Sequence, residues 1–364
     1  MSNPELLDRL TDESVDLLKE MIALPSVSRD EARVADMLQA RLAQWGLAVN
    51  RKGNNLWVRE QACSAGKPVV LLNSHIDTVK PAAGYTRDPF TPQVEDGKLY
   101  GLGSNDAGGP LVSLLALFRY LTTSESERSF SLIFAASAEE EVSGRNGLES
   151  ILPEIGHVDL AIVGEPTGMQ PAVAEKGLMV LDCTAFGKSG HAARNEGVNA
   201  IYQALPAIEW FKGKTFDRVS QFLGPVKMSV TQIEAGTQHN VVPDTCRFVV
   251  DVRVNELYAN TELLGLIKRE CPSAQMPINI QERSTRLGSS RIAMDHPIVQ
   301  RALALGLKPF GSPTMSDQAL MPFTSIKIGP GQSSRSHTAN EFIELDEIRN
   351  GVRTYVSLLA DLRL

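Results

Sequence analysis

Three short runs of apolar residues constrain the fold of this chain more than any other feature. They occupy residues 69–72, 130–136 and 160–163, and none of them alternates regularly with polar residues. Strands of this kind are buried on both faces, as in a parallel sheet covered by helices. A helical pattern at residues 111–121 lies between the first two runs. This order of elements predicts an α/β domain with helices on both sides of its sheet.

Two amphipathic helical patterns precede the first apolar run. The first lies within residues 1–25, where acidic residues are interspersed with leucines. The second follows Ser28-Arg-Asp-Glu31, which has the sequence of a capping box. Gly46 is expected to end this second helix. Its apolar face comprises Val34, Met37, Leu38, Leu42 and Trp45.

From about Gly177 the pattern becomes that of a smaller domain. Strand-like and helical segments follow one another in the order β-α-β-β-α-β, at residues 178–186, 198–211, 226–233, 246–254, 262–270 and 277–280. This order is typical of a self-sufficient ferredoxin-like domain.

The last part of the chain is expected to rejoin the first sheet. It contains a helical pattern at residues 298–304, a strand-like segment at 326–328 and an amphipathic helix at 348–359. Because 364 residues exceed what one core comfortably organises, we predict two domains. The larger comprises residues 1–175 and 286–364, and the smaller, residues 176–285, is inserted into it.

The composition favours a small-molecule partner. The net charge is −7 and no Lys/Arg tract occurs, which argues against binding to nucleic acid or to an anionic membrane. The acidic first helix differs from a secretory leader, and no window approaches the roughly 18 apolar residues that span a bilayer, so we expect a cytoplasmic protein. The cysteines form no CxxC pair, which argues against disulfides and a thiolate zinc site: Cys63, Cys183, Cys246 and Cys271.

Side chains that can bind a metal ion follow the apolar runs. His75 and Asp77 come just after residues 69–72, and Asp77 is placed to fix the tautomer of the imidazole. A structural histidine beside a carboxylate would give the same pair. Glu165 follows residues 160–163 and is held extended by Pro166.

Three successive carboxylates, Glu139, Glu140 and Glu141, follow residues 130–136. They repel one another, so they need a nearby cation or raised pKa values unless they form a solvated acidic face. One of them could bind a metal ion while its neighbour acts as general base.

Asp106 lies in a glycine-rich turn, Gly101-Leu-Gly-Ser-Asn-Asp-Ala-Gly-Gly109, that superficially resembles a dinucleotide fingerprint. Asp106 stands where the last glycine of that fingerprint belongs, and its charge would repel a pyrophosphate. A metal ligand suits the position better, with a helix-capping aspartate as the alternative. His337 follows the strand-like residues 326–328, and its alternative is an ordinary loop histidine.

The position of these residues at the ends of several strands favours metal ligands over the structural, capping and loop alternatives. Several separate strands end in Asp, Glu or His, as a site at the carboxyl edge of an α/β sheet requires. Imidazole and carboxylate ligands without thiolate indicate a catalytic zinc site, with cobalt or manganese as alternatives.

Seven segments together resemble the M20 metallopeptidase family. They occur in the family's order and span nearly the whole chain: Ser74-His-Ile-Asp77, Gly101 to Gly109, Glu139-Glu-Glu141, Gly164-Glu-Pro-Thr167, Gly187-Lys-Ser-Gly-His191, Asn240-Val-Val-Pro243 and His337-Thr-Ala-Asn-Glu341. Within the family, the chain looks most like the branch of acetylornithine deacetylases and succinyl-diaminopimelate desuccinylases. The resemblance implies a large dizinc-hydrolase domain with an inserted lid or dimerisation domain.

The resemblance also implies two divalent metal ions and their ligands. Asp106 would bridge the two metals, His75 and Glu165 would complete one site, and Glu141 and His337 would complete the other.

Further roles are implied for residues around these ligands. Glu140 would be the general base, supported by Asp77 next to the metal centre, and His191 would stabilise the oxyanion, commonly across a dimer interface. Asn240 and Arg253 match positions that contact substrate. A strand-face salt bridge is the alternative for Arg253.

Two departures from the family pattern affect these assignments. The usual Asp-Glu-Glu is here Glu139-Glu140-Glu141, so base and ligand depend on the register of the triplet. Gly108 stands where the family often has a lysine.

The implied reaction is hydrolysis of an acyl-amide bond in an N-acylated amino acid, first of all N-acetylornithine to ornithine and acetate in arginine biosynthesis. The alternatives are deacylation of N-succinylornithine, acetyl-lysine or succinyl-diaminopimelate, a dipeptidase, and a binding module of the same fold without metals. No Gly-x-Ser-x-Gly elbow of a serine hydrolase occurs. The family also leads us to expect a homodimer through the small domain.

Overall fold

A computed structural model of the chain describes residues 3–61, 66–123, 128–194, 196–271 and 278–364. The described residues form two compact units. The first unit contains the residues up to Val173, together with Arg291–Phe310 and Ser316–Leu364, and the second contains Ala174–Ser290 and Gly311–Met315. The sequence predicted residues 176–285 for the inserted smaller domain. Cys63 and residue 277, the first of a predicted strand, lie outside the described residues.

A large mixed sheet forms the middle of the first unit. Its strands lie side by side in the order β1 (Val49–Lys52), β2 (Asn55–Arg59), β6 (Ser131–Ser137), β3 (Val69–His75), β7 (Leu160–Val163), β17 (Ser325–Lys327), β8 (Ala172–Glu175) and β15 (Ser290–Arg291), and β16 (Phe310–Ser312) pairs with β8. The neighbours β6, β3, β7 and β17 run parallel. Strands β3, β6 and β7 are buried along almost their whole length, as their apolar runs predict. The structure thus confirms the predicted α/β class.

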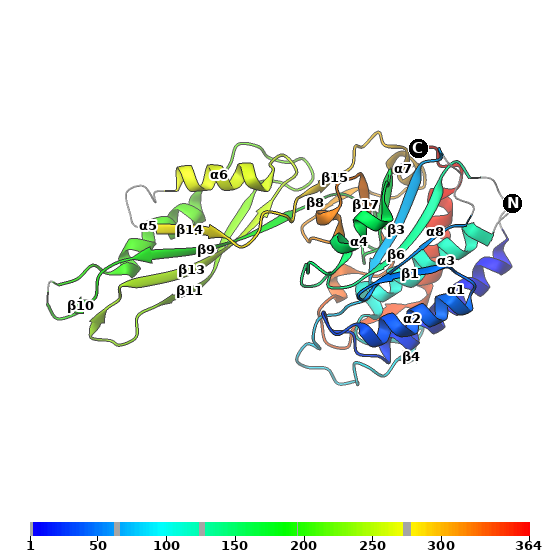
Figure 1. Cartoon of the computed structure of the whole chain (residues 1–364), viewed down its shortest axis with the longest axis horizontal. Helices are drawn as coiled ribbons and strands as arrows, with labels where there is room; N and C mark the ends of the chain where they lie inside the picture. Colours follow the sequence, from blue (N-terminus) through cyan, green and yellow to red (C-terminus); the bar gives the residue numbers. More distant parts are fainter. Residues whose placement is uncertain (1–2, 62–65, 124–127, 195, 272–277) are drawn as a thin grey trace. The chain divides into compact units, whose positions relative to one another are not determined.

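Helices cover both faces of this sheet. On one face, α1 (Pro4–Ile22), α3 (Gly109–Thr123) and α8 (Leu345–Leu359) pack against one another, as Figure 1 shows. Phe118 of α3 contacts Phe134 of β6 with ring centroids 6.1 Å apart. The preceding residue of β6, Ile133, packs instead with α4 (Leu148–Ile155). Because successive side chains of a strand point to opposite faces, α3 and α4 lie on opposite sides of the sheet.

Two further helices and a small sheet complete the first unit. Helix α2 (Ala32–Gln44) contacts β1 and β2, and α7 (Pro297–Ala304) contacts α8. The small sheet has the order β18 (Phe342–Glu344), β5 (Lys98–Tyr100) and β4 (Gln93–Glu95). It therefore ties the end of the chain to the segment that leads into α3.

The predicted capping box before α2 is wrong. Helix α2 begins at Ala32, and the side chain of Glu31 makes no capping hydrogen bond. The Ser28 hydroxyl instead donates to Asp77 at 2.7 Å, and Glu31 accepts hydrogen bonds from the Arg29 backbone and the Asn54 amide. The two side chains thus pair with Asp77, Arg29 and Asn54 and not with the backbone of the helix. A capping box does form at α8, between Glu344 and Glu347.

The second unit is a helix-covered antiparallel sheet of order β11 (Lys227–Ala235), β13 (Thr245–Val254), β9 (Gly177–Phe186) and β14 (Ile278–Glu282). Helices α5 (Ala200–Gly213) and α6 (Asn260–Glu270) share one hydrophobic core with the inward side chains of the sheet. The elements follow the predicted β-α-β-β-α-β order. A short ladder of β10 (Gly190–His191) and β12 (Val241–Val242) extends from this unit.

Among the described residues, no helix combines the length and the apolar character needed to cross a lipid bilayer.

Candidate metal centre

The carboxyl ends of parallel strands bring the predicted ligands to one edge of the large sheet. His75 is the last residue of β3, and Glu140 and Glu141 lie just beyond the end of β6. Glu165 lies two residues beyond β7, next to β3 in the sheet. His337 belongs to the longer segment that follows β17. Parallel neighbouring strands end at the same edge, so these side chains can meet although the sequence separates them widely.

Asp106 reaches the same place by a different route, in the turn Ser104–Gly108 between β5 and α3. The turn needs glycines because it is tightly packed. Gly103 has φ +77°, and a Cβ atom on Gly108 would lie 2.5 Å from the Gly103 carbonyl oxygen and 2.5 Å from Leu18. A side chain at position 108 would therefore collide with the Gly103 carbonyl in this turn.

The His75 ring is the centre of the first group of ligands. Its Nε2 atom lies 3.4 Å from Asp106 Oδ1, 3.7 Å from Glu165 Oε1 and 3.9 Å from Glu140 Oε2. On its other side, Nδ1 lies 2.9 Å from the backbone carbonyl of Asp77. A carbonyl can only accept, so Nδ1 donates the proton, and Nε2 keeps its lone pair toward the carboxylates when the ring is neutral.

His337 and Glu141 form the second group. His337 Nε2 lies 3.0 Å from Glu141 Oε2 and 3.6 Å from Asp106 Oδ2. The two oxygens of Asp106 therefore lie toward different imidazoles, one toward His75 and one toward His337. This is the arrangement that a bridging carboxylate needs.

The charges at this edge are strongly coupled. Burial alone would lower the pKa of His75, but the surrounding carboxylates, Asp106 and Asp77 foremost, raise it well above 6.5. Burial raises the pKa of Glu140 well above 4.5, although His75 opposes this effect. The hydrogen bond to Glu141 raises the pKa of His337 to about 9. Such shifts are typical of groups gathered around a cation or a catalytic proton.

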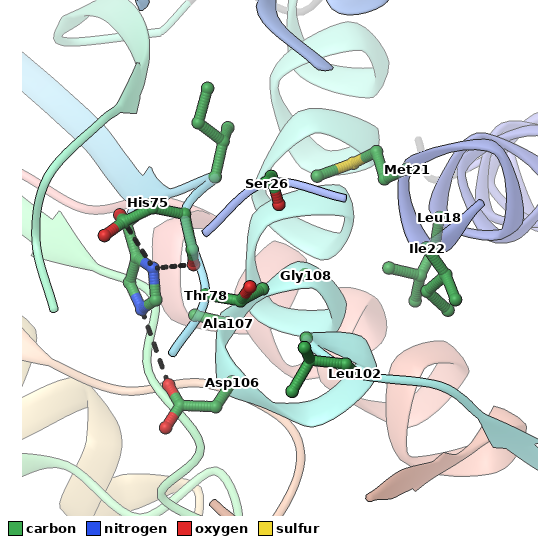
Figure 2. Close-up of a pocket in the computed structure, with 13 residues that line it drawn as sticks. Leu18, Met21, Ile22, Ser26, His75, Thr78, Leu102, Asp106, Ala107 and Gly108 are labelled. Carbon is green, nitrogen blue, oxygen red and sulfur yellow. Dashed lines mark hydrogen bonds and ion pairs between the residues drawn. The ribbon is translucent and has the colours of Figure 1, made fainter. Parts of the chain in front are cut away.

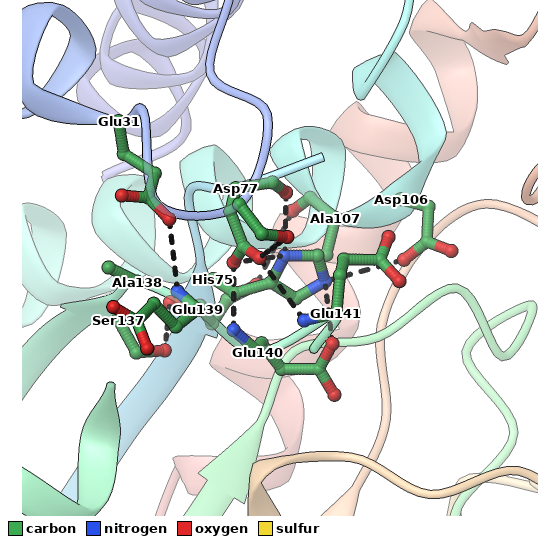
Figure 3. Close-up of polar contacts among 12 residues, drawn as sticks. Glu31, His75, Asp77, Asp106, Ala107, Ser137, Ala138, Glu139, Glu140 and Glu141 are labelled. Atoms are coloured by element: carbon green, nitrogen blue, oxygen red, sulfur yellow. Dashed lines mark hydrogen bonds and ion pairs between the residues drawn. The ribbon is translucent and has the colours of Figure 1, made fainter. Parts of the chain in front are cut away.

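The acidic triplet divides into one residue that points away and two that face the site. The Glu139 carboxylate accepts a hydrogen bond from Asn146 at 3.0 Å, whereas Glu140 and Glu141 point toward His75 and Asp106, as Figure 3 shows. Glu139 also has a positive φ of 55°, which turns the chain at the end of β6. This geometry favours the register in which Glu140 and Glu141 perform the chemistry.

Asp77 supports this turn from behind. Its carboxylate is 1% exposed and accepts the backbone N–H groups of Glu140 at 3.0 Å and Glu141 at 3.1 Å, together with the Ser28 hydroxyl. The same residue fixes His75 through its carbonyl. Asp77 therefore links the His75 ligand to the turn that carries Glu140 (Figure 3).

Three buried acids around the site were given no role there by the sequence analysis. Glu31 accepts the N–H of Glu139 at 3.3 Å, and Asp317 accepts the Ser137 hydroxyl at 2.6 Å. Burial raises the pKa of Asp317 to about 6. Glu341 lies in the His337 segment and accepts three N–H groups from the turn around Asp106. Glu31 was interpreted as part of a capping box and Glu341 as the end of the His337 motif, and Asp317 carried no signal beyond an acid after Ser316.

A small cavity of about 20 Å³ lies behind His75 and Asp106, as Figure 2 shows. Leu18, Met21 and Ile22 of α1 close its far side. This volume holds about one water molecule, so it cannot accept an amino-acid substrate.

The remaining candidates, His191, Asn240 and Arg253, all lie in the second unit. His191 and Asn240 are neighbours, because the Ala192 N–H donates to the Asn240 carbonyl at 3.0 Å. Arg253 lies at the other end of β13, where it makes a two-point ion pair with Asp251. The salt bridge considered as its alternative role is therefore present.

The residues present fit a pair of divalent metal ions. His75 Nε2 is buried without a hydrogen bond of ordinary geometry among the described residues. Ligand atoms around tetrahedral zinc, at about 2.0–2.2 Å from the metal, lie roughly 3.3–3.6 Å from one another. The spacings of 3.4–3.9 Å around His75 Nε2 are close to this range. The donors are nitrogen and oxygen atoms, which suit catalytic zinc and related metals.

Comparison with known protein families identifies one match over most of the chain. The profile described as Peptidase family M20/M25/M40 matches residues 71–361. A succinyl-diaminopimelate desuccinylase of Stenotrophomonas maltophilia is 30% identical over 258 residues, which cover 66% of this chain and 68% of that protein. A [LysW]-lysine/[LysW]-ornithine hydrolase of Sulfurisphaera tokodaii is 26% identical over 359 residues, covering 96% of this chain and 95% of that protein.

Solved structures share the fold over nearly the whole chain. The aminopeptidase PepT of Bacillus cereus has a TM-score of 0.79 at 20% identity, with 97% of this chain and 98% of that chain covered. A dinuclear metal-binding peptidase of the M20 family from Bacillus subtilis has a TM-score of 0.75 at 15% identity, with 98% and 99% covered.

Proposed function

Because the chain belongs to peptidase family M20/M25/M40, and is therefore a metal-dependent hydrolase of amide or peptide bonds, we propose that it removes the acyl group from an N-acylated amino acid. N-acetylornithine is the first candidate, with ornithine and acetate as products. The observation that carries the proposal is the position of Asp106 between His75 and His337, with Glu165 and Glu141 beside them.

In the proposed centre, Asp106 bridges two ions, His75 and Glu165 hold one, and Glu141 and His337 hold the other. Zinc is the preferred metal, with cobalt or manganese as alternatives. Bound in this way, the ions would make a water molecule more acidic and polarise the acyl carbonyl.

Glu140 handles the proton in the proposed reaction. Its carboxyl group lies beside His75 and Glu165, and burial raises its pKa, so it accepts a proton more readily than an exposed glutamate. Glu140 takes the proton from the attacking water and returns it to the departing amine. Asp77 keeps the turn of Glu140 and the His75 ring in place.

Replacement of Glu140 by Gln tests this assignment, with Glu139→Gln as the matched control. We expect Glu140→Gln to keep its metal and to lose about 10²–10⁴-fold in turnover, the usual contribution of a general base. Glu139→Gln, whose side chain is turned toward Asn146, should keep most of the turnover. The reverse pattern would show that the register is shifted by one residue.

The activities for which the relatives are named support a diamino-acid substrate. They are a desuccinylase of succinyl-diaminopimelate and a hydrolase of lysine or ornithine conjugates. Ornithine, lysine and diaminopimelate all carry two amino groups. The resemblance of the motifs is the reason for placing N-acetylornithine before N-succinylornithine, acetyl-lysine, succinyl-diaminopimelate and dipeptides.

A panel of these compounds, with release of the free amine as the readout, tests the order of substrates. The proposal expects the highest kcat/KM for N-acetylornithine and loss of turnover after removal of metal by a chelator. A higher kcat/KM for a succinylated compound or a dipeptide would show that N-acetylornithine is not the preferred substrate. Full turnover in the absence of metal would contradict the proposed metal-dependent mechanism.

The second unit supplies the proposed oxyanion and substrate contacts, His191, Asn240 and Arg253. By resemblance to the family, His191 acts across a homodimer formed through this unit. Mixing inactive His191→Ala and Glu140→Gln proteins would then restore activity, because a mixed dimer contains one complete site. If the chains are shown to exchange partners and the mixture still has no activity, the proposed role of His191 across the dimer is wrong. The cytoplasmic location and the place in arginine biosynthesis stay predictions.

A further inference from the structure

A carboxylate outside the proposed ligand set gathers the backbone of the turn that carries Asp106. Glu341 is 2% exposed. Its Oε1 atom accepts the N–H groups of Asn105 and Asp106, each at 2.9 Å, and its Oε2 atom accepts that of Gly103 at 3.1 Å. Three donors from a four-residue stretch thus converge on one side chain, and one of them belongs to Asp106 itself.

The main chain of Glu341 continues this connection. Strand β18 pairs with β5, with Phe342 opposite Tyr100, and the Gly101 N–H donates to the Glu341 carbonyl at 3.0 Å. The ladder therefore runs directly into the turn of Asp106. Because Glu341 lies four residues after His337, it connects the segments of two ligands that face each other at 3.6 Å.

A second contact holds the same two segments from the other side. The Asn105 side chain accepts the Gln332 N–H at 2.9 Å and donates to the Gln332 carbonyl at 3.1 Å. The turn of Asp106 is thus held on both sides by the segment 332–341.

The carboxylate group of Glu341 suits these contacts better than an amide would. A carboxylate offers two acceptor oxygens to three N–H groups, whereas glutamine would present an NH₂ group to at least one of these donors. A buried carboxylate beside another acid costs free energy, and the three N–H groups of the Asp106 turn are the partners that offset this cost for Glu341. Its position is therefore better explained by the fixing of Asp106 than by general stability.

We propose that Glu341 is a positioning residue that holds the turn of Asp106 in register with the segment of His337 and so sets the affinity of the metal centre. The inference rests on the proposed metal centre. Outer groups that orient metal ligands typically contribute 10–100-fold to metal affinity.

Zinc affinity of the purified full chain, measured by competition with a chromophoric chelator, tests the proposal. We expect Glu341→Gln to bind zinc about 10–100-fold more weakly than the natural chain. The visible spectrum of the cobalt-loaded protein should also change, since it reports the geometry of the ligands. Glu341→Asp withdraws the carboxylate by one methylene and should weaken zinc binding too, so it decides the question if Glu341→Gln does not fold.

Glu60→Gln is the matched control. Glu60 is 7% exposed, pairs with Arg128, and lies beside Leu132 at the amino end of β6, the edge of the sheet opposite the site. This variant should lose stability and keep its zinc affinity within about twofold, well short of the effect of a positioning residue.

Two results would overturn the inference. One is zinc affinity within about twofold of the natural chain in a folded Glu341 variant, and the other is an equal loss in Glu60→Gln, which would indicate general destabilisation. A natural chain that binds no zinc would instead remove the proposed function itself, so the two failures are distinguishable.

Discussion

Replacement of Asp77 by Asn removes one charge from a buried residue on which the metal centre depends. The carboxylate accepts three hydrogen bonds, at 2.7 Å from Ser28, 3.0 Å from Glu140 and 3.1 Å from Glu141. Asparagine has the same shape but only one acceptor oxygen, so its NH₂ group faces at least one of these donors. A buried N–H group without a partner costs about 1–3 kcal/mol, and the remaining hydrogen bonds lose their charge assistance.

We expect two separate effects of Asp77→Asn. The metal-free protein should lose about 1–3 kcal/mol in its free energy of unfolding, measured with urea. With zinc bound, kcat should fall by about 10–100-fold, because the turn of Glu140 and the His75 ring lose their common support.

Asp159→Asn is the matched control for this experiment. Asp159 accepts the N–H group of Val69 at 2.7 Å, at the end of β3 opposite to His75. The Asp159→Asn protein should lose some stability and keep its kcat. If Asp77→Asn keeps kcat as well as this control does, the reasoning that Asp77 positions the reacting groups is refuted.

Three further predictions follow from neighbouring contacts. Ser28→Ala removes a hydroxyl donor to the Asp77 carboxylate and should lower the free energy of unfolding by about 1.5–3 kcal/mol in urea titration; an unchanged midpoint contradicts the contact. The charge of Asp317 raises the pKa of Glu140, so Asp317→Asn should keep the base ionised to lower pH and move the acid limb of the kcat/KM profile to lower pH; a shift in the other direction would refute this coupling. Zinc at 100 times its dissociation constant should add about 2.7 kcal/mol to the stability, and His75→Ala should lose this gain; equal stabilisation of both proteins would place the zinc elsewhere.

The framework of the site could be predicted because its signals are local. Continuous apolar runs identify β3, β6 and β7 as strands buried on both faces, and chemistry-bearing residues follow each of them. Parallel strands then place those residues at one edge of the sheet without further information. The ferredoxin-like order of the second unit was readable for the same reason, since its strands and helices are long and regular.

The supporting network could not be predicted because its contacts are distant in the sequence. Ser28 and Glu31 have the spacing of a capping box, yet their partners Asp77 and Glu139 lie 49 and 108 residues away. Glu341 binds backbone groups 235–238 residues away. The hairpin of β1 and β2 was also missed, because β1 alternates only between half-buried and exposed residues and carries no apolar run.

Anomalous diffraction from a crystal grown with zinc tests the central claim most directly. The account predicts two zinc peaks about 3.5 Å apart, one in contact with His75 and Glu165, the other with Glu141 and His337, with Asp106 between them. Ligand distances should be about 2.0–2.2 Å. A single peak, an empty site, or zinc bound away from these five side chains would contradict it.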